Sequence, residues 1–452
     1  NMLVESIPAV DDSQQANVIK RKRPAVELHS GDSDIGNIVG LCRPIGIFNS
    51  NIFTVVQTDN DYLTLYRYDT NDSNTVNIGQ VSTVKVSGSI AYIKMVYTQF
   101  GLCILNNLNE LFVYTSSGLI EHLVMPSGVT SPIQDICNLN NYLIIGLQSG
   151  TFYWLEPNTW DTTTNEFALN FATAESYPDQ LVSLQNVRGE LYIFGQMSTE
   201  VWQDTGGYNT DSTFTKAEGR DLLRGCKSRN ASIVYDNTTV FIGQDNMVYR
   251  ASSVPERISN SYIEQTISNS SYANLWSYIY RGHLVLVIDL ETMTFCYDAM
   301  TGLWSTMTSN NQTKFEFIGY QDLNYVLLYN LTSRNIYHFN SDVFQDYNGS
   351  IDISLSGVLL SQTPIIIKSL TLITSQNDSA VYNISWRDSN GTYSNPRVIT
   401  TASGDMTMKS TYLCGCVNAP YRIFKIESTS NTSTDIISLS YNNPTQGGYR
   451  GY

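Results

Sequence analysis

The chain has 452 residues, of which 26 are Lys or Arg and 41 are Asp or Glu, so its formal net charge is −15. Hydrophobic residues make up 42% and charged residues 15%, which excludes a mainly disordered chain, because disorder needs low hydrophobicity and dense charge. The acidic balance argues against a protein that grips nucleic acid by neutralising phosphates, since that requires a basic face. No apolar run approaches the roughly 18 residues that would span a bilayer.

The N-terminal segment, residues 1–51, carries few strand signals and is predicted to form an extended arm. It contains Lys20-Arg21-Lys22-Arg23, which is the one dense basic cluster of the sequence. A solvated charge run on a flexible arm is the simplest interpretation of this cluster.

A strand–turn–strand pattern then recurs seven times, with starts roughly 40 to 50 residues apart. Each unit alternates apolar and polar residues and has Gly, Asn or Asp where the chain must reverse. The units are Phe53–Asp69, Met95–Ser117, Ile136–Pro157, Leu184–Thr205, Ile233–Ser253, Trp276–Met307 and Phe317–Asn340.

A repeat of this length, with enough strand for one four-stranded sheet per unit, indicates an all-β fold, a β-propeller of about seven blades over residues 52–347. A string of small β-sandwiches is the alternative. It would need units of about 100 residues with their own linkers, and no Pro/Ser-rich linker interrupts Phe53–Asn340.

The last segment, residues 348–452, changes character and is predicted to form a separate C-terminal β-sandwich. Its candidate strands are Ser350–Leu360, Ile365–Thr374, Ala380–Asp388, Tyr393–Thr401, Tyr421–Ser428 and Asp435–Tyr441. The tetrapeptide Asp388-Ser389-Asn390-Gly391 predicts a tight turn between two of them.

Neither a metal site nor a cofactor site is predicted. The seven cysteines are expected to be mostly buried reduced thiols, as in a protein folded in a reducing cytoplasm, and the lone pair Cys414-Gly415-Cys416 is weak evidence for zinc. The four histidines show no metal-ligating spacing, and no phosphate-binding glycine loop or GxSxG nucleophile motif occurs.

No catalytic residue is predicted, although propellers do host glycosidases. A sialidase-like site would need an arginine cluster, a tyrosine nucleophile and acid–base carboxylates, and the arginines follow no pattern locked to the repeat. The segment Ser385–Tyr393 vaguely resembles the aspartate-box turn of sialidases. It occurs once, outside the predicted propeller, and a hairpin turn explains it.

A long central stretch, Phe171–Cys226, resembles the packaged-DNA-stabilisation proteins of short-tailed bacteriophages, which are also described as tail hub or tail nozzle proteins. The matching pieces occur in the family's order and spacing. They are Ala172-Thr173-Ala174-Glu175, Pro178-Asp179, Gly189 to Gly195, Thr199-Glu200-Val201-Trp202, Thr205-Gly206 and Gly225-Cys226. The early segment Asn1-Met2-Leu3 and the late turn in Trp386–Ile399 are similar to further parts of the family pattern, with Tyr393 where tryptophan is common.

This resemblance implies a structural protein of the virion tail, assembled in the bacterial host cytoplasm, with no enzymatic activity. It implies a homohexameric ring beneath the head-to-tail adaptor that continues the DNA channel, retains packaged DNA and takes part in genome ejection. The implied partners are other copies of the chain, the adaptor protein, a tail needle, tailspike or fibre protein, and double-stranded DNA passing through without sequence-specific binding. Lys20, Arg21, Lys22 and Arg23 are then candidate contacts with the adaptor or with DNA.

Two other functions stay open at this point. A propeller adhesin that binds host glycans through aromatic platforms predicts measurable affinity for a sugar and no role in closing the capsid. A glycosidase predicts turnover of a glycoside that is lost when candidate carboxylates are replaced.

Overall fold

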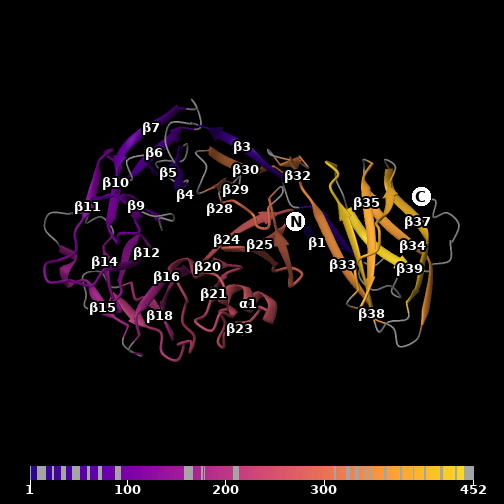
Figure 1. Cartoon of the computed structure of the whole chain (residues 1–452). Coiled ribbons are helices and arrows are strands. Elements are labelled where there is room, and N and C mark those ends of the chain that lie inside the picture. The colour runs from indigo at the N-terminus through magenta and orange to yellow at the C-terminus, as the bar shows by residue number, and fades with distance from the viewer. Residues whose placement is uncertain are drawn as a thin grey trace.

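The part of the chain that the computed structural model describes consists almost entirely of β-strands (Figure 1). The described residues are 2–7, 17–22, 25–31, 37–42, 51–58, 62–69, 74–86, 93–156, 166–174, 177, 179–206, 213–309, 312–321, 326–330, 335–340, 342–343, 345–346, 349–360, 364–376, 379–389, 391–401, 404–417, 421–432 and 435–441. Among these residues the only α-helix is the eight-residue α1, Ser261–Ser268, and no described helix is long and apolar enough to cross a membrane.

Seven four-stranded antiparallel sheets follow one another as the blades of a propeller, which confirms the predicted fold. Blade 1 consists of β4 Asn37–Cys42, β5 Asn51–Gln57, β6 Leu63–Asp69 and β7 Asn74–Gln80. Blade 2 consists of β8 Lys94–Thr98, β9 Gly101–Leu105, β10 Leu111–Thr115 and β11 Ile120–Leu123. Blade 3 consists of β12 Ile133–Leu139, β13 Tyr142–Leu147, β14 Thr151–Leu155 and β15 Phe171–Thr173.

Blades 4 to 6 repeat the same up-and-down order. Blade 4 consists of β16 Leu181–Val187, β17 Glu190–Gly195, β18 Thr199–Asp204 and β19 Phe214–Lys216. Blade 5 consists of β20 Ser232–Tyr235, β21 Thr238–Ile242, β22 Val248–Arg250 and β23 Glu256–Arg257. Blade 6 consists of β24 Ala273–Tyr280, β25 His283–Leu290, β26 Thr294–Asp298 and β27 Leu303–Met307.

Blade 7 is assembled from both ends of the propeller sequence. Its first three strands are β28 Ile318–Gln321, β29 Val326–Tyr329 and β30 Asn335–Asn340, and its fourth is β3 Ala25–Gly31, which pairs with β30. The chain therefore contributes the outer strand of the last blade before it builds the first blade. This pairing gives β30 a partner on its outer side and holds the ring closed.

The same tight turn joins the first two strands of four successive blades. In each turn both central residues have positive φ, the conformation of the type I′ hairpin, which suits Asn, Asp and Gly. The turns are Asn140-Asn141, Arg188-Gly189, Asp236-Asn237 and Arg281-Gly282. Their regular spacing is the physical basis of the sequence repeat.

Alternate residues of each strand pack against opposite neighbours, as the period of two requires. In β9, Leu102 and Ile104 join a core cluster with blade 1, whereas Cys103 and Leu105 join a cluster with blade 3. Comparable clusters lie between the other blades, and the cluster of Ile38, Leu41, Ile52, Val56, Leu327 and Ile336 joins blade 7 to blade 1. Neighbouring blades therefore bury each other's faces all the way round the ring.

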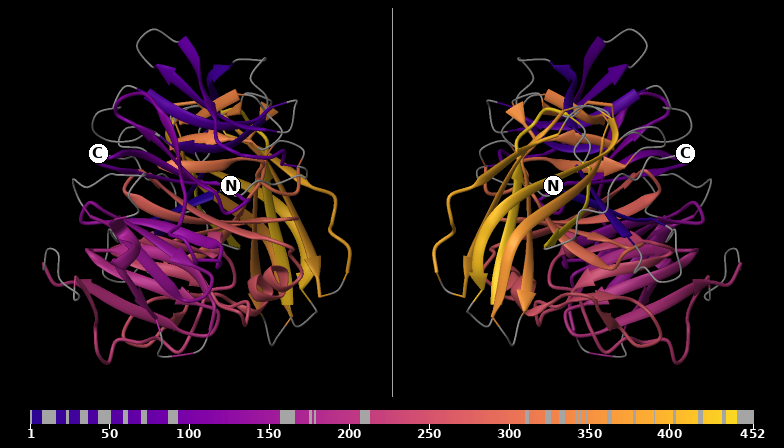
Figure 2. Two further views of the ribbon diagram at one scale, coloured as in Figure 1. Left: turned by 90° about the vertical axis from the view of Figure 1, so that its left-hand side faces the viewer. Right: turned by 90° about the vertical axis from the view of Figure 1, so that its right-hand side faces the viewer.

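The C-terminal segment forms two facing sheets beside the propeller, as Figures 1 and 2 show. One sheet contains β33 Ile353–Leu360, β38 Tyr421–Ser428, β35 Val381–Asp388 and β36 Arg397–Thr400, and the other contains β39 Asp435–Tyr441, β34 Ile365–Gln376 and β37 Gly404–Val417. They share one apolar core that includes Leu372, Tyr382 and Ile426. The sequence did not indicate β37.

The N-terminal segment differs from the extended arm predicted for residues 1–51. Strands β1 Met2–Ile7 and β2 Asn17–Lys22 form a hairpin whose second strand pairs with β39 of the C-terminal sandwich, while β3 and β4 belong to blades 7 and 1. These strands have few strand signals of their own because their stability comes from distant partners. The strands β31 Gln345–Asp346 and β32 Gly349–Ser350 pair with each other across residues 347–348, where the sequence predicts the boundary between propeller and sandwich. The position of that boundary stays a prediction.

The closing strand generates a first prediction, for which Val26 and Leu28 are a matched pair. Val26 is fully buried against Trp276 and Tyr337, and its N–H donates to Asp346 Oδ1 over 2.9 Å, whereas Leu28 is 53% exposed. Val26→Asp should lower the free energy of unfolding by at least ~3 kcal/mol, because it buries a charge, and Leu28→Asp by less than ~1 kcal/mol. Urea titrations of both variants measure this. Equal losses would show that β3 does not secure the ring.

Candidate functional site

The predicted contact residues lie on the N-terminal hairpin. The backbone of Lys20, Arg21 and Lys22 belongs to β2, where Lys20 faces Val4 of β1 on one side and Ile436 of β39 on the other. Their side chains and all of Arg23 lie outside the described residues. The structure therefore places this part of the cluster at the C-terminal sandwich, and not on the propeller.

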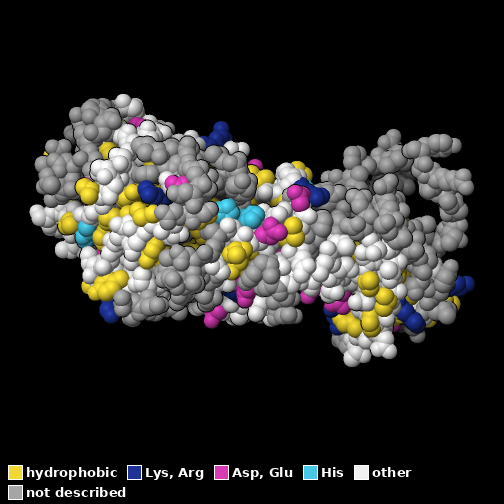
Figure 3. Space-filling view, turned by 90° about the horizontal axis from the view of Figure 1, so that it is seen from above, with side chains coloured by type: hydrophobic (Ala, Val, Ile, Leu, Met, Phe, Trp, Pro, Cys, Tyr) yellow, Lys and Arg dark blue, Asp and Glu magenta, His cyan; other side chains and the backbone are white. Residues whose placement is uncertain are grey.

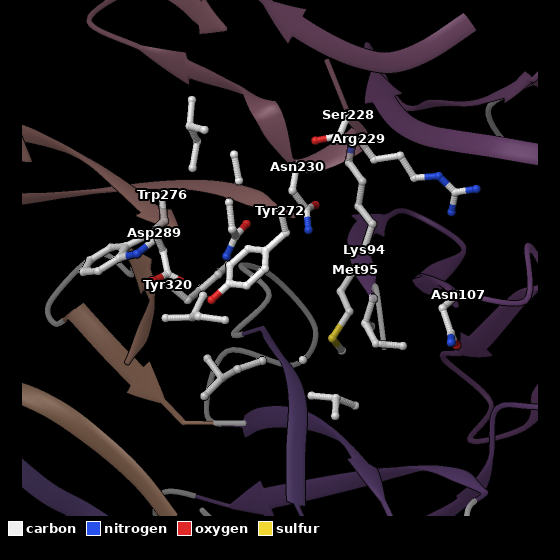
Figure 4. Close-up of a pocket in the computed structure, with 18 of the residues that line it drawn as sticks. Lys94, Met95, Asn107, Ser228, Arg229, Asn230, Tyr272, Trp276, Asp289 and Tyr320 are labelled. Carbon is white, nitrogen blue, oxygen red and sulfur yellow. The ribbon is translucent and has the colours of Figure 1, made fainter. Parts of the chain in front are cut away.

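A cavity of about 680 Å³ lies among the first strands of several blades, and Figure 4 shows the side chains that line it. Its wall includes residues of β4, β8, β24 and β28 and the segment Lys227–Asn230 that precedes β20. Cationic, amide and aromatic side chains meet there, among them Lys94, Arg229, Asn107, Tyr272 and Trp276. None of them was predicted as a site residue.

A buried carboxylate ties three blades together beside this cavity. Asp135 of β12 has no exposed surface and accepts from Lys94 Nζ of β8 at 2.7 Å, from the Leu184 N–H of β16 at 2.7 Å and from Ser183 Oγ at 3.0 Å. Ser183 Oγ in turn lies 2.8 Å from Ser232 Oγ of β20. Each of these bonds crosses between the innermost strands of neighbouring blades, so the group fixes the blades at the centre of the ring.

Two further cations at the cavity have amide or carbonyl oxygens as partners. Lys227 Nζ donates to Asn246 Oδ1 at 2.7 Å and to the Ile267 carbonyl at 3.1 Å, and burial lowers the pKa of its ammonium group. Arg229 reaches across to blade 2 and blade 3, where it donates to Asn109 Oδ1 and, at 3.2 Å, to Gln134 Oε1. These side chains present positive charge at the cavity wall.

The opposite wall carries a carboxylate that is already paired. Asp289 Oδ1 lies 3.1 Å from Lys314 Nζ, which also donates to Tyr272 Oη at 2.8 Å. Burial raises the pKa of Asp289 despite the neighbouring ammonium, and the same aspartate raises the pKa of Lys314 against the effect of burial. Asp289 and Lys314 therefore form a mutually stabilised pair.

The four histidines lie apart from the cavity. His283 pairs with Asp298 over 2.8 Å inside blade 6, His122 stacks on Phe112, and His29 and His338 meet edge to face in blade 7. Within the described ranges, no group of three or more His, Cys, Asp or Glu side chains has a metal-binding arrangement. Six of the seven cysteines are buried, Cys416 is exposed, and burial raises the pKa of Cys103, Cys137 and Cys226 to about 12.

The long stretch that carries the family resemblance forms a tight structural unit around the turn between β17 and β18. Asp179 Oδ2 accepts the N–H groups of Met197 at 2.7 Å and Ser198 at 2.9 Å. A side chain at Gly195 would collide with the Asp179 carboxylate and displace it from this turn. The Asp and Gly of the motif therefore form one turn.

The end of the same stretch returns to this turn. Thr199 and Leu222 exchange two backbone hydrogen bonds of 2.9 Å, and Cys226 N–H donates to the Gly195 carbonyl at 2.8 Å. A side chain at Gly225 would collide with the backbone of Gln196. The spacing of the motif thus reflects the folding of blade 4.

The late turn in the C-terminal sandwich also has a structural explanation. Asp388 makes two hydrogen bonds, of 2.6 and 2.7 Å, with the Arg422 guanidinium, which is buried and donates to the carbonyls of Cys414 and Cys416. The Gly391 N–H donates to the Asp388 carbonyl at 2.9 Å, which confirms the predicted tight turn. The aspartate of this segment holds a buried arginine that links the two sheets.

Sequence reasoning missed Lys94, Asp135, Lys227 and Arg229. One signal was available, because Asp135 lies in the first strand of its unit, Ile133–Leu139, where the corresponding strands of the neighbouring units have no acid at that position. A carboxylate inside a buried strand needs a partner. Which cation supplies it depends on the radial arrangement of the blades, which a linear sequence does not show.

The buried group at Asp135 generates a second prediction. Asp135→Asn should lower the free energy of unfolding by about 3 kcal/mol, because it leaves the Lys94 charge without its buried partner. Asp236→Asn is the matched control, since its pair with Arg250 is exposed and should contribute less than ~1 kcal/mol. Denaturant unfolding followed by fluorescence measures both losses. A loss at Asp135 no larger than that at Asp236 would refute the role of this ion pair.

A third prediction concerns pH. The Arg422 guanidinium lowers the pKa of Asp388, so this carboxylate contributes stability that is complete above its unfolded value near pH 4 and is lost as the pH falls through its folded value. The stability difference between the native chain and Asp388→Asn should therefore shrink as the pH falls from about 5 towards 2.

Hydrogen exchange of the β35 and β38 amides measures this locally. Glu427→Gln, in the exposed pair with Lys425 on the same sheet, is the control. A difference that does not change with pH would contradict the assignment.

Comparison with known proteins identifies the family. A family model described as "Bacteriophage P22 Gp10, beta-propeller" matches residues 32–333, about two thirds of the chain. This range begins just after β3 and ends before β30, so it covers the propeller apart from the two strands that close it. No curated protein matches the chain.

Two solved structures that align with the chain have low sequence identity to it. The selenomethionine-substituted virginiamycin B lyase from Staphylococcus aureus aligns with 8% identity and a TM-score of 0.45, over 69% of this chain and 98% of that one. The computationally designed Ika8 protein aligns with 12% identity and a TM-score of 0.41, over 71% of this chain and all of that one. On the family match and the seven-bladed fold, the chain belongs to the bacteriophage P22 Gp10 β-propeller family of packaged-DNA-stabilisation proteins, structural components of the phage virion.

Proposed function

We propose that this protein is the tail nozzle or hub of a short-tailed phage. In this role several copies of the chain form a ring below the head-to-tail adaptor, and the family resemblance implies that there are six. The ring continues the DNA channel, retains the packaged genome and takes part in its ejection. The observation that carries the proposal is the family match over residues 32–333, together with a propeller whose signature residues serve its folding.

The structure is suited to a rigid ring subunit. Apolar clusters join every pair of neighbouring blades, and β3 closes the last blade, so the propeller can transmit load without opening. The sandwich stands to one side of the propeller and offers a second body for a distal partner such as a needle, tailspike or fibre (Figure 1).

The surface charge supports a role in which DNA passes by without being held. On the face shown in Figure 3, described Lys, Arg, Asp and Glu side chains are scattered among polar and apolar ones and form no large basic field. An acidic protein with a net charge of −15 repels phosphates weakly, so a duplex would not be arrested by it. The cluster Lys20–Arg23 is the local exception, and in this proposal it contacts the adaptor or DNA.

Immuno-electron microscopy of native particles tests the proposal. Antibody label is expected on the tail between the portal vertex and the tip, and averaged images of that region are expected to show a six-fold ring. Label that is scattered over fibres, or absent from tails, would refute the nozzle and would favour the host-glycan adhesin.

A charge variant tests the basic cluster in the same particles. Replacing Lys20, Arg21, Lys22 and Arg23 by Gln should increase loss of packaged DNA as salt is raised, because each removed cation weakens contact with an anionic surface. The matched control replaces four exposed cations elsewhere by Gln, namely Lys85, Arg188, Arg281 and Lys368. Equal DNA retention in the two variants would exclude the cluster as a contact and leave the labelling result unaffected.

A further inference from the structure

One sheet of the sandwich, made of β33, β38, β35 and β36, has a face that is turned away from the apolar core. Alternation along β35 and β38 puts Tyr382, Ile384 and Ile426 in the core, so the residues between them point outwards. The strand register brings the outward residues of neighbouring strands side by side. This outer face includes Val358, Val381, Arg387, Val398, Ile423 and Lys425.

The outer face carries several exposed apolar side chains. Val358 is 60% exposed and Val398 is 63% exposed, and Val381 is exposed as well. Val358 lies opposite Ile423 across the β33–β38 ladder. Val398 lies opposite Asn383, which is two residues from Val381 on the same side of β35. Apolar side chains that are exposed next to one another mark contact surfaces.

An aromatic ring and two cations lie on the same face. The Arg387 guanidinium and the Lys425 ammonium both lie over the exposed ring of Tyr393, at 5.3 and 5.7 Å from its centroid. Lys425 also pairs with Glu427 at 2.5 Å, whereas Arg387 forms no ion pair with a carboxylate among the described residues. The outer face therefore combines apolar groups with Tyr and Arg, residue types that are enriched in protein interfaces, and has a positive charge in excess.

The charge of the chain is divided unequally between its two bodies. Residues 24–347, which contain the propeller strands β3 to β30, carry 15 Lys or Arg and 32 Asp or Glu, a net charge of −17. The remaining residues, which contain the β1–β2 hairpin and the sandwich, carry 11 Lys or Arg and 9 Asp or Glu, a net charge of +2. This asymmetry favours contact between the sandwich of one copy and the propeller of another.

We propose that the outer face is the surface through which one copy of the chain binds the acidic propeller of the next copy in the ring. The sandwich stands beside its own propeller (Figure 1), so each copy carries both surfaces that the contact needs. A contact between two different surfaces can repeat around a closed ring. Contact between two outer faces would bring like charges together and would stop at two copies.

This inference rests on the nozzle proposal, which supplies the ring, and names the surface that joins its copies. Immunolabelling decides the nozzle. Cross-linking between copies decides the outer face, and it can be measured on the purified chain whether or not the label is found on tails.

A photo-cross-linking amino acid in place of Ser356, which is exposed and lies opposite Lys425, identifies what covers the outer face. Irradiation of native particles and of the concentrated purified chain is expected to give a product of two copies, in which position 356 is joined to a peptide of the propeller. Such a product in either sample supports the proposal. A product with another tail protein or with a second sandwich, or no product of two copies in either sample, would overturn it.

Matched double variants test the same contact, with the yield of the two-copy product as the readout. Val398→Asp/Lys425→Glu changes the outer face. Ile366→Asp/Lys368→Glu is the control, because it makes similar changes at exposed positions of β34 in the other sheet, where Ile366 is 60% exposed. The outer-face variant should lower the yield at least tenfold, because it sets acidic groups against an acidic partner, and the control should lower it less than twofold.

Two further measurements guard the result. Thermal melting of each variant confirms that the fold is retained, and the milder pair Val398→Ser/Lys425→Gln should lower the yield several-fold. Higher salt should lower the yield of the native chain, because it screens the attraction between the positive face and the acidic propeller. Equal yields from the outer-face variant and its control, or a yield that rises with salt, would overturn the proposal.

Discussion

The structure depends on the pairing of one N-terminal strand, β3, with the last strand of the propeller sequence, β30. Without β3, blade 7 would have three strands, and the buried side chain of Val26 would be missing from a cluster that includes Trp276, Phe315 and Tyr337. The contact is long-range and therefore entropically costly to form. Once formed, it makes the stability of every blade depend on both ends of the ring.

Two kinds of contact then hold the closed ring. Apolar clusters between blades supply most of the buried surface and follow directly from the alternation of residues along each strand. The hydrogen-bonded group at Asp135 fixes the relative positions of the blades. Its hydrogen bonds to Lys94, Ser183 and Leu184 form only when the innermost strands of three blades are correctly placed. The innermost strands thus hold the blades together and also line the cavity.

The conspicuous sequence motifs of the chain form tight turns and hold neighbouring segments together through hydrogen bonds and ion pairs. Asp179 and Gly195 build the turn of blade 4, and Asp388 holds Arg422 between the two sheets of the sandwich. Both motifs therefore serve the folding of the chain. The residues that line the central cavity come from different repeats and carry no motif, so only the folded ring reveals them.

The sequence by itself determined the fold class, the number of blades and most strands of the sandwich, because alternation and tight turns are local properties repeated along the chain. The repeat could be recognised from the regular spacing of its turns, which are Asn140-Asn141, Arg188-Gly189, Asp236-Asn237 and Arg281-Gly282. Only the tertiary structure decided that β1 and β2 join the sandwich, that β3 closes the propeller, and that Lys227, Arg229 and Trp276 meet at one cavity. The strand pairings join residues hundreds of positions apart, and the cavity residues come from different repeats, so their contacts depend on burial against distant partners, which no local pattern of residues encodes.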